Sequence, residues 1–163
     1  MKKFIHCVVM IFLLAACGSP DNKQKDDDMT LVKNYVAAVE KLDYEAMGNY
    51  LADNYMGLGP SYGDTIYKKE AIESWKYNSV NLYSKIEHTM ARYAFVTITE
   101  GPAKGNWIAC WSELKITYKN GKSVMIWANS DYMVENGKIT RTLSLYNEAD
   151  ALRQLGYQIV APQ

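Results

Sequence analysis

Residues 106–146 carry the pattern that decides the fold. They read NWIACWSELKITYKNGKSVMIWANSDYMVENGKITRTLSLY. Three runs of strand-forming residues are separated there by Asn120-Gly121 and Asn136-Gly137. Asn-Gly is the preferred pair for a tight type I′ hairpin, because both central residues need a positive φ. We therefore expect consecutive strands, over about 106–118, 122–134 and 138–146, to pair antiparallel in a meander.

The segment before this meander predicts three helices. From Thr30 onward apolar residues recur at helical spacing, which indicates an amphipathic helix. Asp43 is well placed to cap a short second helix, and residues 68–83 form the third. A short strand over about 55–60 separates the second helix from the third.

Two further elements complete the pattern. Residues 85–99 predict a fourth long strand, and residues 147–157 a short closing helix that ends at Gly156. Helices followed by an antiparallel meander give an α+β fold in which a curved sheet wraps around three N-terminal helices as a cone. A cone of this kind is a natural ligand pocket.

The N-terminus has the pattern of a bacterial lipoprotein precursor. Lys2 and Lys3 precede an apolar run that is too short to span a bilayer. The run ends in Leu14-Ala15-Ala16-Cys17, which resembles a lipobox. This predicts a signal peptide over residues 1–16, cleavage before Cys17, and lipidation of Cys17 with acyl chains such as palmitate. The mature protein would then lie in the cell envelope, anchored to a membrane and facing away from the cytoplasm.

Residues 18–28 contain no side chain that can build a core. We expect residues 17–28 to form a flexible tether and residues 29–158 to form one domain. The acidic run over 24–28 also resembles the export signal that sends some lipoproteins of Gram-negative bacteria to the cell surface. A solvated linker and display on the outer membrane or cell surface both stay open.

Composition excludes several classes of function. Without Lys2 and Lys3 the mature chain has 16 basic and 18 acidic residues, so no basic surplus favours nucleic-acid binding. Cys110 would be its only unmodified cysteine, and His88 its only histidine. They are too few preferred ligands for a zinc site, and Cys110 cannot form an internal disulfide. We expect no metal and no cofactor.

Five short stretches, in order, resemble the superfamily of nuclear transport factor 2. They also resemble its SnoaL-like and ketosteroid isomerase-like branches. The resemblance covers nearly all of residues 30–157, and it implies the cone-shaped fold without implying one function. The stretches are Asn34-Tyr35-Val36, Leu42-Asp43, residues 51–55, residues 69–72 and residues 135–139.

The catalytic residues of the isomerase branch carry over only in part. That enzyme is a worked case of a carboxylate base acting beside a tyrosine and a protonated acid. Tyr35 falls where the resemblance places the tyrosine, but the base position falls near Gly59. The third position falls near Ser130, with Asp131 beside it on the opposite face of a regular strand. A missing base counts against this chemistry.

Other chemistries of this fold are no better supported. A dehydratase of the scytalone type would need a pair of histidines, and His88 is alone on a predicted strand, where it would be structural or exposed. An epoxide hydrolase of the limonene type would need an Asp/Arg/Asp relay, and no spacing joins an arginine to two carboxylates here.

The family's register assigns one strand face to the cone. Cys110, Ser112 and Leu114 share that face with Ser130, Tyr132, Ser144 and Tyr146. The mixture of small polar and apolar side chains suits an enclosed pocket. The 13 tyrosines of the sequence are compatible with a ring-containing or carbohydrate ligand, and equally with an ordinary core. The predicted ligand-binding residues are Tyr35, Tyr55, Trp75, Ser112, Ser130, Tyr132, Ser144 and Tyr146.

The opposite face would carry an apolar surface that needs a cover. It holds Trp107, Trp111, Met125, Trp127, Leu143 and Leu145. We expect a second copy of the chain to cover it, as a homodimer. A register slipped by one residue would instead turn these tryptophans, together with Glu113 and Asp131, into the cone.

Three functions follow from these alternatives. The leading hypothesis is a lipid-anchored module that binds a small molecule or a partner without catalysis. An enzyme of isomerase, cyclase or hydrolase type, using Asp131 or Glu113 with Tyr35, needs the slipped register. A purely structural dimerisation domain would fill the cone with its own side chains.

Overall fold

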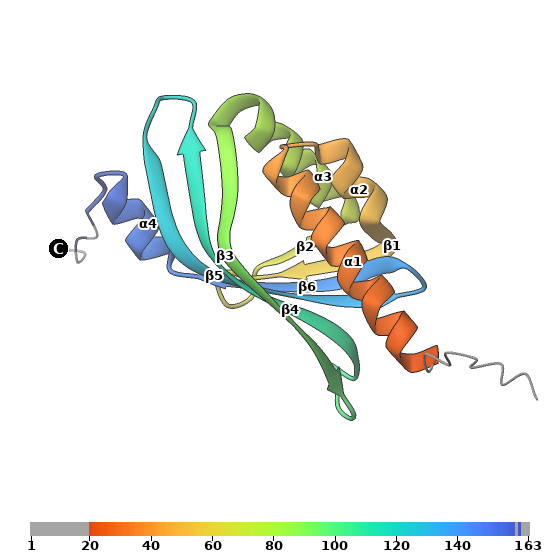
Figure 1. Cartoon of the computed structure of the whole chain (residues 1–163). Coiled ribbons are helices and arrows are strands. Elements are labelled where there is room, and N and C mark those ends of the chain that lie inside the picture. The colour runs from red at the N-terminus through yellow and green to blue at the C-terminus, as the bar shows by residue number, and fades with distance from the viewer. Residues whose placement is uncertain (1–19, 159, 161–163) are drawn as a thin grey trace, which may run out of the picture.

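The fold is a strongly curved, unclosed sheet whose concave side holds a layer of helices (Figure 1). The computed structural model describes residues 20–158 and Val160. The signal peptide, cleavage and lipidation assigned to residues 1–17 therefore lie outside the described residues and stay predictions. Six strands pair in the order β2-β1-β6-β5-β4-β3.

Within residues 20–158, four helices and one π-helical segment accompany the sheet. Helix α1 spans Pro20–Glu40, α2 spans Tyr44–Tyr50, and α3 spans Lys68–Tyr77. The π-helical segment η1, Asn78–Leu82, continues α3, and α4 spans Glu148–Gln154. Asp43 caps α2 as expected, because its side chain accepts a hydrogen bond from the backbone N–H of Ala46 at 2.9 Å. Helices α1, α2 and α3 lie together on one side, and α4 lies apart beside β5 (Figure 1).

The four long strands match the predicted meander closely. They are β3 (Tyr83–Ile98), β4 (Gly105–Tyr118), β5 (Ser123–Glu135) and β6 (Lys138–Tyr146). Each pairs antiparallel with the next along the chain. The two shorter strands are β1 (Leu51–Leu58) and β2 (Thr65–Tyr67). Strand β1 pairs parallel with β6, so the first strand lies beside the last, and β2 adds an antiparallel edge.

Only one of the two Asn-Gly turns has the expected geometry. Asn136 and Gly137 both have a positive φ, as a type I′ hairpin requires. At the other turn Gly121 has a positive φ of 83° but Asn120 does not. The backbone N–H of Tyr118 donates to the carbonyl of Lys122 at 2.8 Å, which closes a three-residue connection. The type I′ prediction for Asn120-Gly121 was wrong, although the hairpin itself is present.

Helix α1 corrects the predicted tether. It begins at Pro20, ten residues before the expected start, so residues 20–28 are helical rather than flexible. Gln24 donates to the Asp28 carboxylate at 2.7 Å, and the Lys25 ammonium lies 5.2 Å from the centre of the Phe95 ring. Asp28 is itself buried. Strand β3 is long enough to cover this end of the helix, and the local composition of residues 18–28 could not reveal that contact.

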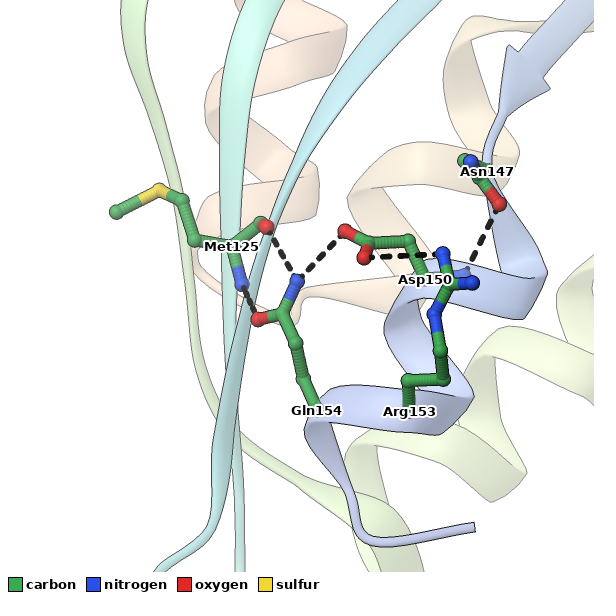
Figure 2. A network of polar contacts seen from close by, with 5 residues as sticks. All are labelled: Met125, Asn147, Asp150, Arg153 and Gln154. Carbon is green, nitrogen blue, oxygen red and sulfur yellow. Dashed lines mark hydrogen bonds and ion pairs between the residues drawn. The ribbon is translucent and has the colours of Figure 1, made fainter. Parts of the chain in front are cut away.

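Helix α4 covers an edge of β5 that β6 leaves open. Pairing of β5 with β6 ends at Ala128 and Tyr146, so Met125 lies beyond it. The Gln154 amide replaces the missing strand there: it accepts from the Met125 N–H at 2.9 Å and donates to the Met125 carbonyl at 2.8 Å (Figure 2). Asn147 caps α4 by accepting from the N–H of Asp150. Gly156, with a φ of 95°, follows its end as predicted.

The end of β1 approaches β6 too closely for a side chain. Gly59 has a φ of 91°, and a Cβ atom built there would lie 2.2 Å from the backbone carbonyl oxygen of Ser144. Because that oxygen belongs to the sheet, it cannot move aside cheaply. Gly63 has a nearly identical φ of 92°, yet a Cβ atom there would meet nothing within 4 Å.

Alanine substitutions at these two glycines distinguish the cost of a left-handed backbone from the cost of a close contact. Gly63→Ala should lower the free energy of unfolding by about 1–2 kcal/mol, the cost of a left-handed conformation. Gly59→Ala should cost about 1–3 kcal/mol more, because it also forces backbone apart. Urea unfolding followed by tryptophan fluorescence measures both values. Equal losses in the two variants would contradict the close approach of β1 to β6.

Candidate functional site: a neutral cavity in the cone

A cavity of about 500 Å³ lies between the concave face of the sheet and the helices. Residues from α1, α3 and α4 and from all six strands line it. Its apolar lining includes Val39, Leu58, Pro60, Ile66, Ala71, Trp75, Ile86, Leu114, Ile116, Val124, Ile126, Ala128, Ala151, Leu152 and Leu155. The volume and the apolar surface are those of a site for a ring-sized organic molecule.

Hydroxyl groups form the polar part of the lining. The Tyr55 hydroxyl and the Thr142 Oγ1 atom share a hydrogen bond of 2.6 Å between β1 and β6. The Ser130 and Ser144 hydroxyls lie 3.2 Å apart on β5 and β6. These strands are neighbours, so the hydroxyls line one continuous wall. Each hydroxyl can both donate and accept, so this wall can adapt to either kind of polar group on a ligand.

The tyrosines of the cavity are neutral hydrogen-bonding groups. Burial raises the pKa of Tyr35 and of Tyr132 well above the ordinary value for a phenol. Burial also raises the pKa of Tyr83 to about 12, with the nearby Tyr118 adding to the shift. None of these groups ionises near neutral pH. Rings also pack against one another, with the centroid of Tyr35 5.7 Å from that of Tyr132.

Among residues 20–158, two ionisable side chains other than tyrosine line the cavity, His88 and Glu148. His88 is mostly buried, and desolvation lowers its pKa although Glu40 opposes the shift, so the imidazole is neutral at neutral pH. Glu148 is exposed at the start of α4 and accepts a hydrogen bond from Ser61 at 3.0 Å. The interior lining is therefore uncharged.

The predicted ligand-binding residues are brought together, with one exception. Seven of them line the cavity: Tyr35, Tyr55, Trp75, Ser130, Tyr132, Ser144 and Tyr146. Ser112 lies on the same strand face but is buried, 2 % exposed, and is not part of the lining. Their role in binding stays a prediction.

The slipped register is wrong. Trp111 and Trp127 are 44 % and 65 % exposed, so they lie on the outer face of the sheet. Glu113 pairs with Trp127, and Asp131 lies between Ala109 and Leu143, so both carboxylates share that outer face. Neither lines the cavity. Burial against the outer face raises the pKa of Asp131, which accepts a hydrogen bond from Asn129. The enzyme that would use Asp131 or Glu113 with Tyr35 inside the cone has no support in this geometry.

The position where the isomerase resemblance places the catalytic base also has no space for a side chain. It falls near Gly59, within Leu58-Gly59-Pro60, and these three residues line the cavity. Because a Cβ atom at Gly59 would collide with the Ser144 carbonyl, the backbone leaves no room for a carboxylate side chain. The close packing of β1 on β6, as well as the glycine at this position, therefore accounts for the missing base.

Sequence reasoning missed two parts of the lining. His88 was expected to be structural or exposed, but it faces the cavity with Ile86, two residues before it on β3. This alternation of Ile86 and His88 was the available signal. Helix α4 contributes Ala151, Leu152 and Leu155. Nothing local in their sequence indicates that the helix folds back over the cone.

Metal ligands and membrane-spanning helices are two other features that bear on function. Between residues 20 and 158 no group of three or more His, Cys, Asp or Glu side chains is placed to hold a metal ion. Within the same part of the chain, every helix is too short or too polar to cross a membrane.

Comparison with known proteins identifies the fold. No protein-family model matches the sequence, and no curated protein matches it. A candidate polyketide cyclase from Xanthomonas campestris pv. campestris superposes with a TM-score of 0.66 at 16% identity, covering 80% of this chain and 97% of that one. An epoxide hydrolase of M. tuberculosis, described as LEH-like, gives 0.61 at 12% identity, covering 80% and 90%.

A third solved structure carries the name of the superfamily. The NTF2-like protein from Burkholderia xenovorans LB400 gives a TM-score of 0.58 at 14% identity, covering 79% of this chain and 95% of that one. Other matches are a candidate SnoaL-like polyketide cyclase and a protein with a ketosteroid isomerase-like fold. The chain therefore has the nuclear transport factor 2-like fold, the α+β cone that SnoaL-like and ketosteroid isomerase-like proteins share.

Proposed function

We propose that this protein is a lipid-anchored module that binds an uncharged, ring-containing small molecule in the cone without changing it chemically. The observation that carries the proposal is the cavity of about 500 Å³ with an uncharged interior lining of apolar side chains and hydroxyls. A charged ligand would lose its hydration there without gaining an opposite charge. A neutral ring with one or two polar groups would lose little hydration free energy on entering the cavity.

Two features favour binding over the alternatives weighed from the sequence. A dimerisation domain would fill its cone with its own side chains, whereas this cone contains open volume. Isomerase chemistry needs a carboxylate base at the end of β1, where Gly59 leaves no room for one. Solved relatives of the fold include candidate cyclases and an epoxide hydrolase, but at identities below 20% those activities belong to those proteins.

Filling the cavity tests the binding function. Ala128 lines the cavity, and Asn129, the next residue on β5, points to the outer face. With 2-methylnaphthalene as the probe, Ala128→Phe should weaken binding at least about tenfold, because the added ring occupies the ligand volume, while Asn129→Phe should change it less than about twofold. Quenching of tryptophan fluorescence measures the Kd. Undetectable binding to the unmodified protein, or equal weakening in both variants, would contradict the proposal.

The anchor places the module at a membrane surface in the cell envelope. The lipobox pattern at Leu14–Cys17 supports lipidation of Cys17. Because α1 begins at Pro20, only Gly18 and Ser19 would separate the lipidated residue from the helix. The three Cα-to-Cα steps from Cys17 to Pro20 span about 10 Å at most, so the start of α1 would be held close to the membrane rather than on a long tether.

Removing the anchor cysteine tests the location. Cys17→Ala should move the protein from the membrane fraction to the soluble fraction and abolish incorporation of labelled palmitate. Cys7→Ala is the matched control, since Cys7 lies within the signal segment and should leave both readouts unchanged. Retention of the Cys17→Ala protein in the membrane fraction would exclude lipidation as the anchor.

The outer face of the sheet supports a homodimer. Trp111, Met125, Trp127 and Leu145 come from three adjacent strands and are each 44–65 % exposed. A contiguous apolar surface of this kind is unusual on a monomer. A second copy would match it about a twofold axis, so that the same patch is buried on both chains.

A charge placed in this patch tests the dimer. Trp127→Glu should convert the dimer into a monomer, because two buried carboxylates would face each other across the axis. Tyr77→Glu is the control, because Tyr77 on α3 is similarly exposed, at 59 %, and lies away from this face. Analytical ultracentrifugation measures the mass. A monomeric unmodified protein would contradict the dimer, as would a Trp127→Glu protein that stays dimeric.

A further inference from the structure

His88 is the one side chain of the inner cavity that the proposed binding function leaves without a role. It lies on β3 at the position that pairs with Leu114, and its ring lines the cavity. Only 14 % of its side chain is exposed. A buried imidazole without a partner costs stability, so its presence among Ile86, Leu114 and Ile116 calls for a reason.

Glu40 fixes how this imidazole is held. Glu40 is the last residue of α1, and its Oε1 atom accepts a hydrogen bond of 2.7 Å from the backbone N–H of His88. The same oxygen lies 3.5 Å from the Nδ1 atom of the His88 ring. Nδ1 is closed off from solvent and has no hydrogen bond of good geometry. A proton on Nδ1 would lie close to a carboxylate oxygen, which favours it electrostatically, whereas a bare lone pair there would lie close to negative charge.

The tautomer that follows leaves an acceptor on the cavity side. With the proton on Nδ1, the Nε2 atom carries the lone pair. Nε2 lies on the other side of the ring from Nδ1, and Nδ1 is the nitrogen that faces Glu40. Because burial lowers the pKa of His88, the neutral ring is favoured at neutral pH and this lone pair can accept a hydrogen bond.

We propose that Nε2 of His88 accepts a hydrogen bond from a hydroxyl group on the ligand, so that the cavity selects neutral ring-containing alcohols or phenols. This inference rests on the proposed binding function. The hydroxyl wall of Tyr55, Thr142, Ser130 and Ser144 can meet a donor or an acceptor, so it does not by itself select one kind of polar group. His88 with its Nδ1 proton toward Glu40 offers the ligand only an acceptor.

A pair of probes of matched shape tests this selection. 2-Naphthol and 2-methylnaphthalene differ in one group, a hydroxyl against a methyl. The purified protein should bind 2-naphthol about 3–10-fold more tightly, the value of one hydrogen bond in a buried site. Equal binding of the two probes would overturn the inference and leave the proposed function standing. Binding of neither probe would contradict both.

Variants of His88 and Glu40 assign the preference to this pair. His88→Phe keeps a flat ring and removes the acceptor, so the ratio of the two Kd values should fall to about one. His88→Gln retains an acceptor oxygen and should keep part of the preference. Glu40→Gln should reduce the preference, because an amide can donate to Nδ1 and so no longer holds the proton there.

The ratio of the two Kd values separates this role from a structural one. A merely structural His88 would weaken both probes equally in every variant and leave their ratio unchanged, which would overturn the inference. Where His88→Phe fails to fold, His88→Gln and Glu40→Gln decide the question, because an unchanged ratio of the two Kd values in both variants would overturn the inference.

Discussion

The parallel pairing of β1 with β6 is the constraint on which the cone depends. Strand β1 lies between α2 and α3 in the chain, and β6 is the last strand of the meander, so this pairing ties the helical half to the end of the sheet half. It places the Tyr55 hydroxyl on Thr142 across the cavity wall. It also brings Gly59 against the Ser144 carbonyl, where a larger residue would push the two strands apart.

The meander could be predicted because its signals are local. Alternation and the two Asn-Gly pairs located four strands to within about two residues. The start of α1 could not be predicted, since the first helical turns are held by contacts such as Lys25 with Phe95, whose residues lie far apart in the chain. The three-residue strand β2 was missed for the same reason: it exists only because β1 offers it an edge.

The residues of the site show the same difference between local signals and contacts distant in the chain. The side chains of β5 and β6 that face the cavity followed from a period of two along each strand, once the register was chosen. Choosing the register required the resemblance to a known fold, since a shift of one residue exchanges the faces. His88 and α4 did not follow. The role of His88 depends on Glu40, which lies 48 residues earlier, and α4 is held to β5 through one glutamine amide (Figure 2).

Backbone packing and strand register determine which chemical groups line the cavity. Close packing at Gly59 excludes a carboxylate where the fold could place a base, and the strand register turns Asp131 and Glu113 outward. What remains inside is neutral: phenols whose pKa burial raises, serine and threonine hydroxyls, and one imidazole kept uncharged by desolvation. Such a lining can hold and orient a neutral molecule. We assign the specificity for a hydroxyl donor to His88, which lies against Glu40.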